Sequence, residues 1–258
     1  MAEPYTPNEM MTIAAARALR NDDVCFVGIG MPSAAANLAR LTHAPDITLI
    51  YESGTIATKP NVLPLSIGDG ELCDTALTTV SVPEMFRYWV QGGRISVGFL
   101  GGAQIDRFAN LNTTVVGRYD KPKVRLPGGG GAPEIATSCG EIFIIMGQSK
   151  RSFVDKLDFI TSLGHGAGHG DRERLGAKTK GPTKLVTDLA VFEPHAETKE
   201  MTVVSIHPGV TREQIQENTG WAVRYAGKIG ETPAPTVQEL EVLRELNART
   251  ARAHGKAA

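Results

Sequence analysis

The sequence predicts an α/β fold in which an open, mainly parallel sheet is flanked by helices in a single domain. Three observations support this prediction. The first sixty residues alternate helix, strand, helix and strand patterns, which is typical of crossover units. Short apolar runs bounded by glycine, at 95–102 and 141–147, are typical of strands. A length of 258 residues with 41% hydrophobic residues suffices for one sizeable core.

The N-terminal elements follow from periodicity and from helix-end signals. A first helix is predicted over 7–20, because small and apolar residues share one side and Asn8 can cap its start. A short β run then ends at Gly28 and Gly30. An alanine-rich helix is expected next, over 33–41.

Glu52 follows an apolar strand over 47–51 and precedes Gly54, which permits a sharp turn. A strand of this kind delivers the next residue to the rim of the sheet, where open α/β sheets place chemistry. From these residues alone, Glu52 is either a functional carboxylate or a solvated charge.

The rest of the chain is predicted to add strands and a terminal helix. Pro83 opens a helix that two glycines end. Strands are expected at 95–102, 141–147, 185–194 and 201–209, with an acidic turn before the last. A final helix begins near Thr236, so 236–258 is assigned to a C-terminal helix and tail of one domain spanning 1–258.

Composition disfavours several classes of function. With 27 basic and 28 acidic residues the formal net charge is −1, so we expect no nucleic-acid partner. Neither a run of about 18 apolar residues nor a secretory leader pattern occurs, so we expect a cytoplasmic protein without a membrane span. Cys25, Cys73 and Cys139 are far apart, which predicts buried, reduced thiols.

Gly28, Gly30 and the downstream Glu52 imitate a dinucleotide-binding pattern. The third glycine of that pattern is absent, because Pro32 and Ser33 occupy its end. NAD binding is therefore disfavoured. A plain turn from strand to helix that shapes a cleft is the favoured interpretation.

Four consecutive glycines at 128–131 can present several backbone N–H groups to a ligand, because no side chains intervene. Two such donors could stabilise an oxyanion. A flexible loop is the alternative, and the setting in a parallel-sheet protein favours the functional interpretation.

His165, His169 and Asp171 have the residue types of a metal site. Their glycine-rich segment lacks the fixed spacing that a helix gives to paired histidine ligands. We therefore predict no metal site.

Ordered motifs along nearly the whole chain resemble the B subunit of glutaconate-type class I coenzyme A (CoA) transferases. They are GIGMPSAAANLARLTHAPD, ESG, GGAQIDRFANLNTTVVG, GGGGA, KRSFVDKLDFITS, GDRERLG, LVTDLAVF and ENTG. Several motifs in a fixed order are far more specific than any one of them.

The resemblance implies a role for each candidate residue. The glutamate of the ESG motif is the nucleophile in such enzymes, and Glu52 matches it. The match to GGGGA implies that Gly130 and Gly131 donate backbone N–H groups near the reacting carbonyl. The match to GGAQID makes Gln104 a candidate for orienting the glutamate or the substrate.

The implied reaction moves CoA between carboxylic acids by a ping-pong mechanism, through an acyl-glutamyl anhydride and a glutamyl-CoA thioester on Glu52. CoA is a substrate, and no tightly bound cofactor is expected. Gly28 and Gly30 are expected to border the acyl-CoA site. A homologous A subunit is expected to complete the cleft in a heterotetramer or heterooctamer, and the chain alone would be inactive.

Two alternatives stay open. One is a CoA-ester hydrolase of the same fold, as in ring-degradation pathways, and the other is a subunit without a catalytic role. The motif ESG rather than ENG, and the retention of Glu52, favour the glutaconate-like transferases. The donor and acceptor acids, and any role of His165 and His169 in selecting them, are not fixed by the motifs.

Overall fold

The computed structural model describes residues 4–255, and the chain divides into two compact units. Unit 1 runs to Phe99 and resumes at Ala234, whereas unit 2 comprises Leu100–Pro233. Both units combine strands with helices, so the predicted α/β class is confirmed. The assignment of 1–258 to one domain stays a prediction.

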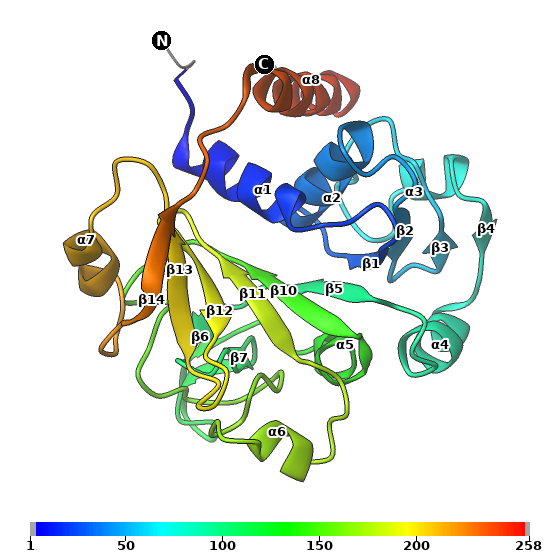
Figure 1. Ribbon diagram of the computed structural model, residues 1–258. Coiled ribbons are helices and arrows are strands. Elements are labelled where there is room, and N and C mark those ends of the chain that lie inside the picture. The colour runs from blue at the N-terminus through cyan, green and yellow to red at the C-terminus, as the bar shows by residue number, and fades with distance from the viewer. Residues whose placement is uncertain (1–3, 256–258) are drawn as a thin grey trace. The chain divides into compact units, whose positions relative to one another are not determined.

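Unit 1 is built on a small sheet whose centre is parallel. The strands lie in the order β5-β1-β2-β3-β4 (Figure 1). Their bounds are β1 Val24–Val27, β2 Thr48–Tyr51, β3 Thr55–Ile56, β4 Thr78–Thr79 and β5 Val97–Leu100. β1 pairs in parallel with β2 and β5, whereas β2, β3 and β4 pair antiparallel. The predicted strand before Glu52 is therefore confirmed.

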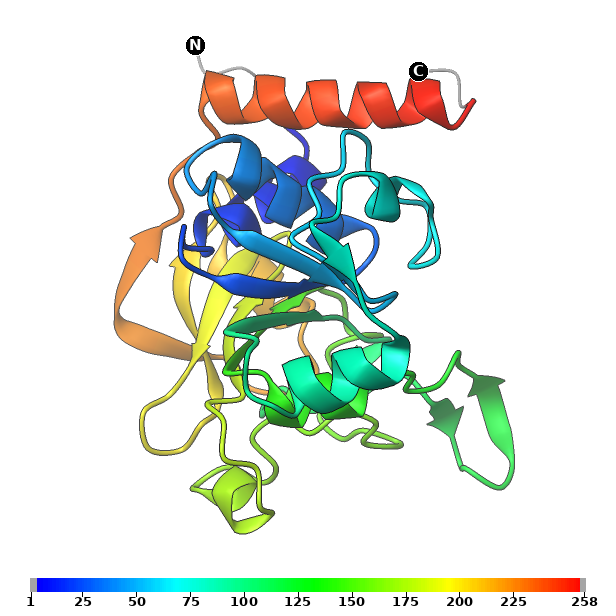
Figure 2. The same cartoon turned by 90° about the vertical axis from the view of Figure 1, so that its right-hand side faces the viewer.

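The helices of unit 1 include the four predicted ones in order, and α3 is an additional short helix. They are α1 Pro7–Arg17, α2 Met31–Leu41, α3 Glu71–Asp74, α4 Val82–Glu84 with a π-helical continuation over Met85–Val90, and α8 Val237–Ala253. The prediction that Asn8 caps α1 is wrong, because Thr6 and Glu9 form a reciprocal capping box there. α8 lies across α1 and α2 (Figures 1 and 2). The last three residues of the predicted tail lie outside the described part of the chain.

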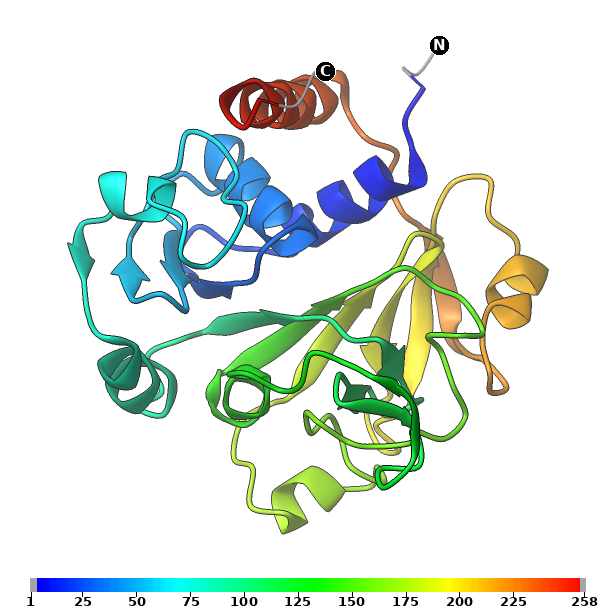
Figure 3. The same ribbon diagram turned by 180° about the vertical axis from the view of Figure 1, so that it is seen from behind.

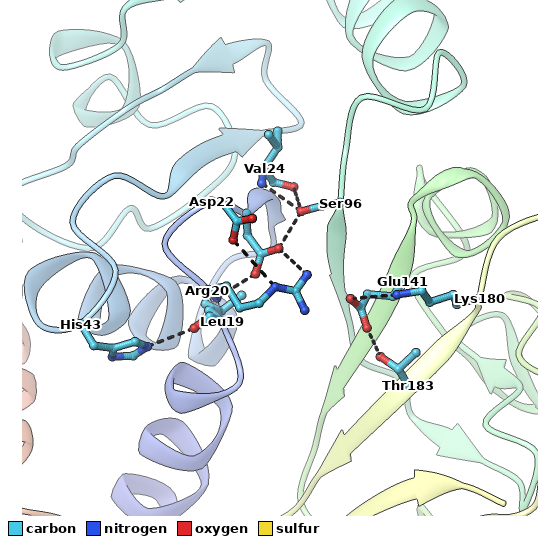
Figure 4. A network of polar contacts seen from close by, with 10 residues as sticks. Leu19, Arg20, Asp22, Val24, His43, Ser96, Glu141, Lys180 and Thr183 are labelled. Carbon is cyan, nitrogen blue, oxygen red and sulfur yellow. Dashed lines mark hydrogen bonds and ion pairs between the residues drawn. The ribbon is translucent and has the colours of Figure 1, made fainter. Parts of the chain in front are cut away.

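Buried polar groups fasten the starts of neighbouring strands. In unit 1, the Ser96 hydroxyl donates to the buried Asp23 carboxylate at 2.9 Å and accepts from the Val24 N–H at 2.9 Å (Figure 4). In unit 2, the Thr183 hydroxyl donates to Glu141 at 2.6 Å. These bonds fix the strand register where each strand begins.

Unit 2 carries a mixed sheet in the order β10-β11-β12-β13-β14 (Figure 1). The strands are β10 Glu141–Ile145, β11 Pro182–Val186, β12 Ala190–Pro194, β13 Met201–Ile206 and β14 Arg224–Glu231. The prediction of a single strand over 185–194 is wrong. The Thr187 hydroxyl accepts hydrogen bonds from the N–H groups of Leu189 and Ala190, and the chain turns there between β11 and β12. β14 was not predicted, because its sequence RYAGKIGE has no apolar alternation and its side chains are mostly exposed or half-buried.

The smaller elements of unit 2 are two short ladders and three helices. The ladders are β6 Gln104–Ile105 with β7 Leu111–Asn112, and β8 Val115–Gly117 with β9 Pro122–Arg125. The helices are α5 Ala132–Ser138, α6 Asp171–Arg174 and α7 Arg212–Glu217. α7 lies beside the outer strand β14, to which the Tyr225 hydroxyl fastens it (Figure 3).

The cysteine prediction is correct for two of three residues. Cys25 and Cys139 are buried, and burial raises the pKa of Cys139 to about 12. The predicted burial of Cys73 is wrong, because the short helix α3 exposes it. Within residues 4–255, no helix has both the length and the apolar character needed to cross a membrane.

An ion pair fastens α8 to α1. Arg17 donates from two nitrogens to the Glu239 carboxylate, both at 2.6 Å. Burial alone would raise the pKa of Glu239, but the hydrogen bonds from Arg17 and Thr236 outweigh it and lower the pKa from 4.5 to about 2. This contribution to stability is therefore present above pH 4.5 and lost as the pH falls towards 2.

Replacing Glu239 should reveal this pH dependence. We expect Glu239→Gln to lower the free energy of unfolding by about 1–2 kcal/mol at pH 7, as for a charged hydrogen bond. The deficit should shrink by about half by pH 3, because the Glu239 carboxyl is protonated in the unfolded wild-type chain at that pH while it is still mostly ionised in the folded protein. Urea unfolding at both pH values measures it, with the exposed Glu241→Gln as control. A deficit that is equal at both pH values would contradict the assignment.

Candidate active site

Glu52 leaves the sheet beside Gly28. In the parallel pair of β1 and β2, Val27 aligns with Tyr51, so the next residue of each strand lies at the same sheet edge. This confirms the predicted position of Glu52 at the rim. Its side chain is half-buried, and within residues 4–255 no hydrogen bond or ion pair engages its carboxylate.

The end of β2 is anchored to α2 by Tyr51. Its side chain is fully buried, and its hydroxyl lies 2.7 Å from the Ser33 hydroxyl and 3.3 Å from the Asn37 amide nitrogen, which donates to it. Burial raises the pKa of Tyr51 to about 12, so the phenol stays neutral. Because Glu52 is the next residue, this anchor fixes where its backbone begins.

The turn after Glu52 depends on Gly54. Its N–H donates to the Tyr51 carbonyl at 3.0 Å, and its φ of +100° suits glycine alone. A Cβ atom at this position would lie 1.9 Å from the Val80 carbonyl oxygen. The predicted sharp turn is confirmed. Its hydrogen bond spans Glu52, and the Val80 N–H fastens the end of the turn by donating to the Gly54 carbonyl at 2.9 Å.

Gly28 and Gly30 form the turn from β1 into α2. Gly30 precedes the helix with φ 81° and ψ −129°, a conformation that other residues avoid. Pro32 and Ser33 lie in the first turn of α2, and Ser33 occupies the position at which a nucleotide-binding turn would carry its third glycine. Gly30 also lines a pocket of about 480 Å³ between the starts of α1 and α2 and the helix α8.

Gln104 belongs to unit 2 and is held by Asn112. Its side-chain oxygen accepts from the Asn112 amide at 2.7 Å, and the same amide donates to the Val115 carbonyl at 2.6 Å. This contact orients the Gln104 side chain. In the described part of the chain its NH₂ group makes no hydrogen bond and so remains available as a donor.

The glycine loop 128–131 leads directly into α5. Gly128 donates to the Thr113 carbonyl at 2.8 Å, which ties the loop to the residue after Asn112. Gly128 and Gly130 have φ values of 103° and 49°. Among residues 4–255, no acceptor engages the N–H groups of Gly129, Gly130 or Gly131. Three successive N–H donors of this loop are therefore free within the described residues.

Arg172, which was not predicted to have a role, is buried and holds α5, the helix that follows the glycine loop. It is 1% exposed, and its guanidinium donates to the carbonyls of Ala136, Leu163, Gly164 and Thr179 and to the Thr179 hydroxyl. Burial lowers its pKa. The bond to Ala136 fixes α5, and thus the loop before it. The motif GDRERLG was the only sequence signal.

His165, His169 and Asp171 do not converge on one point. His165 is buried with Nε2 2.8 Å from the Pro182 carbonyl, and burial lowers its pKa. Asp171 instead binds Arg174 and the Ala167 N–H. No group of three metal-binding side chains occurs within residues 4–255.

A model of the coenzyme A transferase family matches residues 8–218. The chain belongs to this family. It is 66% identical over 252 residues to the B subunit of the 3-oxoadipate CoA-transferase of Pseudomonas knackmussii, covering 98% of this chain and 97% of that one. It is 36% identical to the B subunit of the glutaconate CoA-transferase of Acidaminococcus fermentans, covering 93% and 92%.

One solved structure and one further sequence relative extend these matches. The crystal structure of the Acidaminococcus fermentans glutaconate CoA-transferase matches with a TM-score of 0.88 and 33% identity over 95% of both chains. A cholesterol ring-cleaving hydrolase subunit of Mycobacterium tuberculosis is 27% identical over 93% of each chain. The predicted recognition of a CoA-transferase B subunit of the glutaconate type is thereby confirmed.

The lack of space for a side chain between Gly54 and Val80 leads to a prediction about stability. We expect Gly54→Ala to lower the free energy of unfolding by more than about 3 kcal/mol, because the methyl group meets the Val80 oxygen and φ is positive. Gly70→Ala is the matched control, since it has φ −58° and no atom within 4 Å of its Cβ position. Thermal and urea unfolding measure both. Equal effects of the two substitutions would refute the role given to Gly54.

Proposed function

We propose that this chain is the B subunit of an enzyme that transfers CoA between carboxylic acids, with Glu52 as the covalent nucleophile. The observation that carries the proposal is the half-buried carboxylate of Glu52, held at the rim by a fixed turn and engaged by no other described group. A carboxylate without a partner keeps its oxygen electron pairs available for attack on a carbonyl carbon.

The first half-reaction begins when a Glu52 oxygen attacks the thioester carbonyl of an acyl-CoA. The resulting oxyanion accepts hydrogen bonds from the N–H groups of Gly130 and Gly131, and the free donors of the glycine loop support this role. Expulsion of the CoA thiolate leaves an acyl-glutamyl anhydride. The thiolate then attacks the glutamyl carbonyl, releases the first acid and forms a glutamyl-CoA thioester.

The second half-reaction reverses these steps with another acid. The carboxylate of that acid attacks the glutamyl thioester and expels CoA, which then attacks the acyl carbonyl of the new anhydride. This regenerates the Glu52 carboxylate and gives the second acyl-CoA. Gln104, oriented by Asn112, supplies its free NH₂ group to the substrate carboxylate or to Glu52.

The same proposal includes a partner chain and a substrate class. The relatives at 66% and 36% identity are both named as B subunits, which supports an A subunit that completes the site in a heterotetramer or heterooctamer. The 66% relative also supports 3-oxoadipate as one of the acids. A cytoplasmic enzyme that needs no resident cofactor fits this chemistry.

Replacement of Glu52 tests the covalent role. In the complex with its A subunit, Glu52→Gln should lower kcat by at least about a thousandfold, because an amide cannot form the anhydride. Borohydride after acyl-CoA should modify Glu52 in the wild-type protein, as detected by mass spectrometry of peptides. Glu217→Gln, an exposed glutamate on α7, is the control. An active enzyme that is never modified at Glu52 would disprove the mechanism.

A CoA-ester hydrolase is the second candidate, supported by the ring-cleaving hydrolase relative. There Glu52 would act as a base or nucleophile towards water. Our proposal predicts that no free CoA thiol accumulates with or without an acceptor acid, because each thioester that is broken is replaced by another, on Glu52 or on the second acid. Thiol release by the complex, monitored with and without 3-oxoadipate, measures this. Sustained release without any acid would favour the hydrolase.

A further inference from the structure

A two-stranded hairpin extends from unit 2 just before the glycine loop. We call residues 115–125 the arm, and it consists of β8, a short turn and β9. Figure 2 shows its two green strands at the lower right, apart from the other strands and helices of unit 2. All side chains from Arg118 to Arg125 except Pro122 are exposed, and Tyr119 and Val124 are 60% and 45% exposed.

The arm concentrates positive charge in a chain whose formal net charge is −1. It carries four cationic side chains, Arg118, Lys121, Lys123 and Arg125, against the one carboxylate of Asp120, which Arg118 already engages. Within residues 4–255, no carboxylate forms an ion pair with Lys121 or Lys123. The arm therefore presents two unpaired ammonium groups to solvent.

The base of the arm is fixed to the rest of unit 2, so its charged side chains are held in a defined position. The N–H of Gly117 donates to Asp158 at 2.9 Å, and Tyr119 stacks on Phe159 with ring centres 5.6 Å apart. Arg125 covers the Tyr119 ring at 5.0 Å. Lys123 and Arg125 alternate with Pro122 and Val124 along β9 and so share one face of the ribbon. A hairpin of two strands would not hold this shape alone.

The arm and the glycine loop are close in the chain. Lys123 lies five residues before Gly128, so at most about 17 Å of backbone separates the two. The pantetheine chain of CoA has thirteen bonds between its sulfur and the first phosphorus, which is roughly 16 Å when extended. A thioester carbonyl at the glycine loop therefore leaves the phosphates of the same CoA molecule within reach of the arm.

We propose that the arm binds the phosphates at the nucleotide end of CoA, with Lys121 and Lys123 as the contacting residues. This inference rests on the proposed function, because it takes the glycine loop as the acyl end of the site. The diphosphate and 3′-phosphate of CoA carry several negative charges close together. The unpaired ammonium groups of Lys121 and Lys123 are complementary to them in charge.

The test uses the complex with the A subunit and the double variant Lys121→Glu/Lys123→Glu. Its matched control is Lys178→Glu/Lys228→Glu, which makes the same change in net charge at two other exposed lysines of unit 2. Titration calorimetry should show that the arm variant binds CoA at least about tenfold more weakly than the wild-type complex, whereas the control variant binds it as the wild type does. Adenosine 3′,5′-bisphosphate should compete with CoA less effectively in the arm variant by a similar factor. The kcat/KM for an acyl-pantetheine thioester, which lacks the nucleotide, should be unchanged.

Three results would overturn the proposal. One is CoA binding by the arm variant as tight as in the control, and another is an equal loss of kcat/KM for acyl-CoA and acyl-pantetheine. The third is dissociation of the A subunit, which would make the arm a protein-docking surface. Failure of the proposed function would give a different result, because the wild-type complex would then bind CoA without transferring it to an acid.

Discussion

The turn from Tyr51 to Gly54 is the constraint on which the placement of Glu52 depends. Tyr51 cannot shift, because its buried hydroxyl is held by Ser33 and Asn37 of α2. Gly54 cannot shift, because its backbone touches that of Val80. Glu52 lies between these two fixed points. Its carboxylate is therefore positioned by backbone geometry, which leaves both oxygens free for chemistry.

The glycine loop of unit 2 is held in a different way. The glycine loop has no side chains with which to stiffen itself, so its order depends on its two ends. Gly128 is tied to Thr113 at one end, and α5 is held by the buried Arg172 at the other. A guanidinium suits this position, because its five N–H groups satisfy several carbonyls at once.

The order of elements could be predicted from the sequence where local patterns and packing agree. The strand before Glu52, the helix α2 and the leucines of α8 all follow simple periodicity. β14 could not be predicted, because parallel pairing with β13 specifies it rather than any pattern of its own. The turn at Thr187 was not predicted either, because a threonine hydroxyl forms it where glycine or asparagine is usual.

The candidate site was predictable in its residues but not in its supports. Glu52 and the glycine loop are visible as an acidic strand end and a run of small residues. The anchoring roles of Tyr51 and Arg172 require distant partners that only the folded chain brings together. The same applies to Cys73, whose exposure depends on the packing of a four-residue helix.

The division of unit 1 into two stretches of chain has a consequence for biosynthesis. α8 supplies Leu240, Leu243 and Leu246 as buried residues of this unit, and its Glu239 and Arg244 pair with Arg17 and Glu9 of α1. On the ribosome, α1 and α2 are made first and α8 last, with all of unit 2 in between. Unit 1 therefore leaves a helix face uncovered throughout translation, whereas unit 2, continuous in sequence, can complete its own sheet earlier.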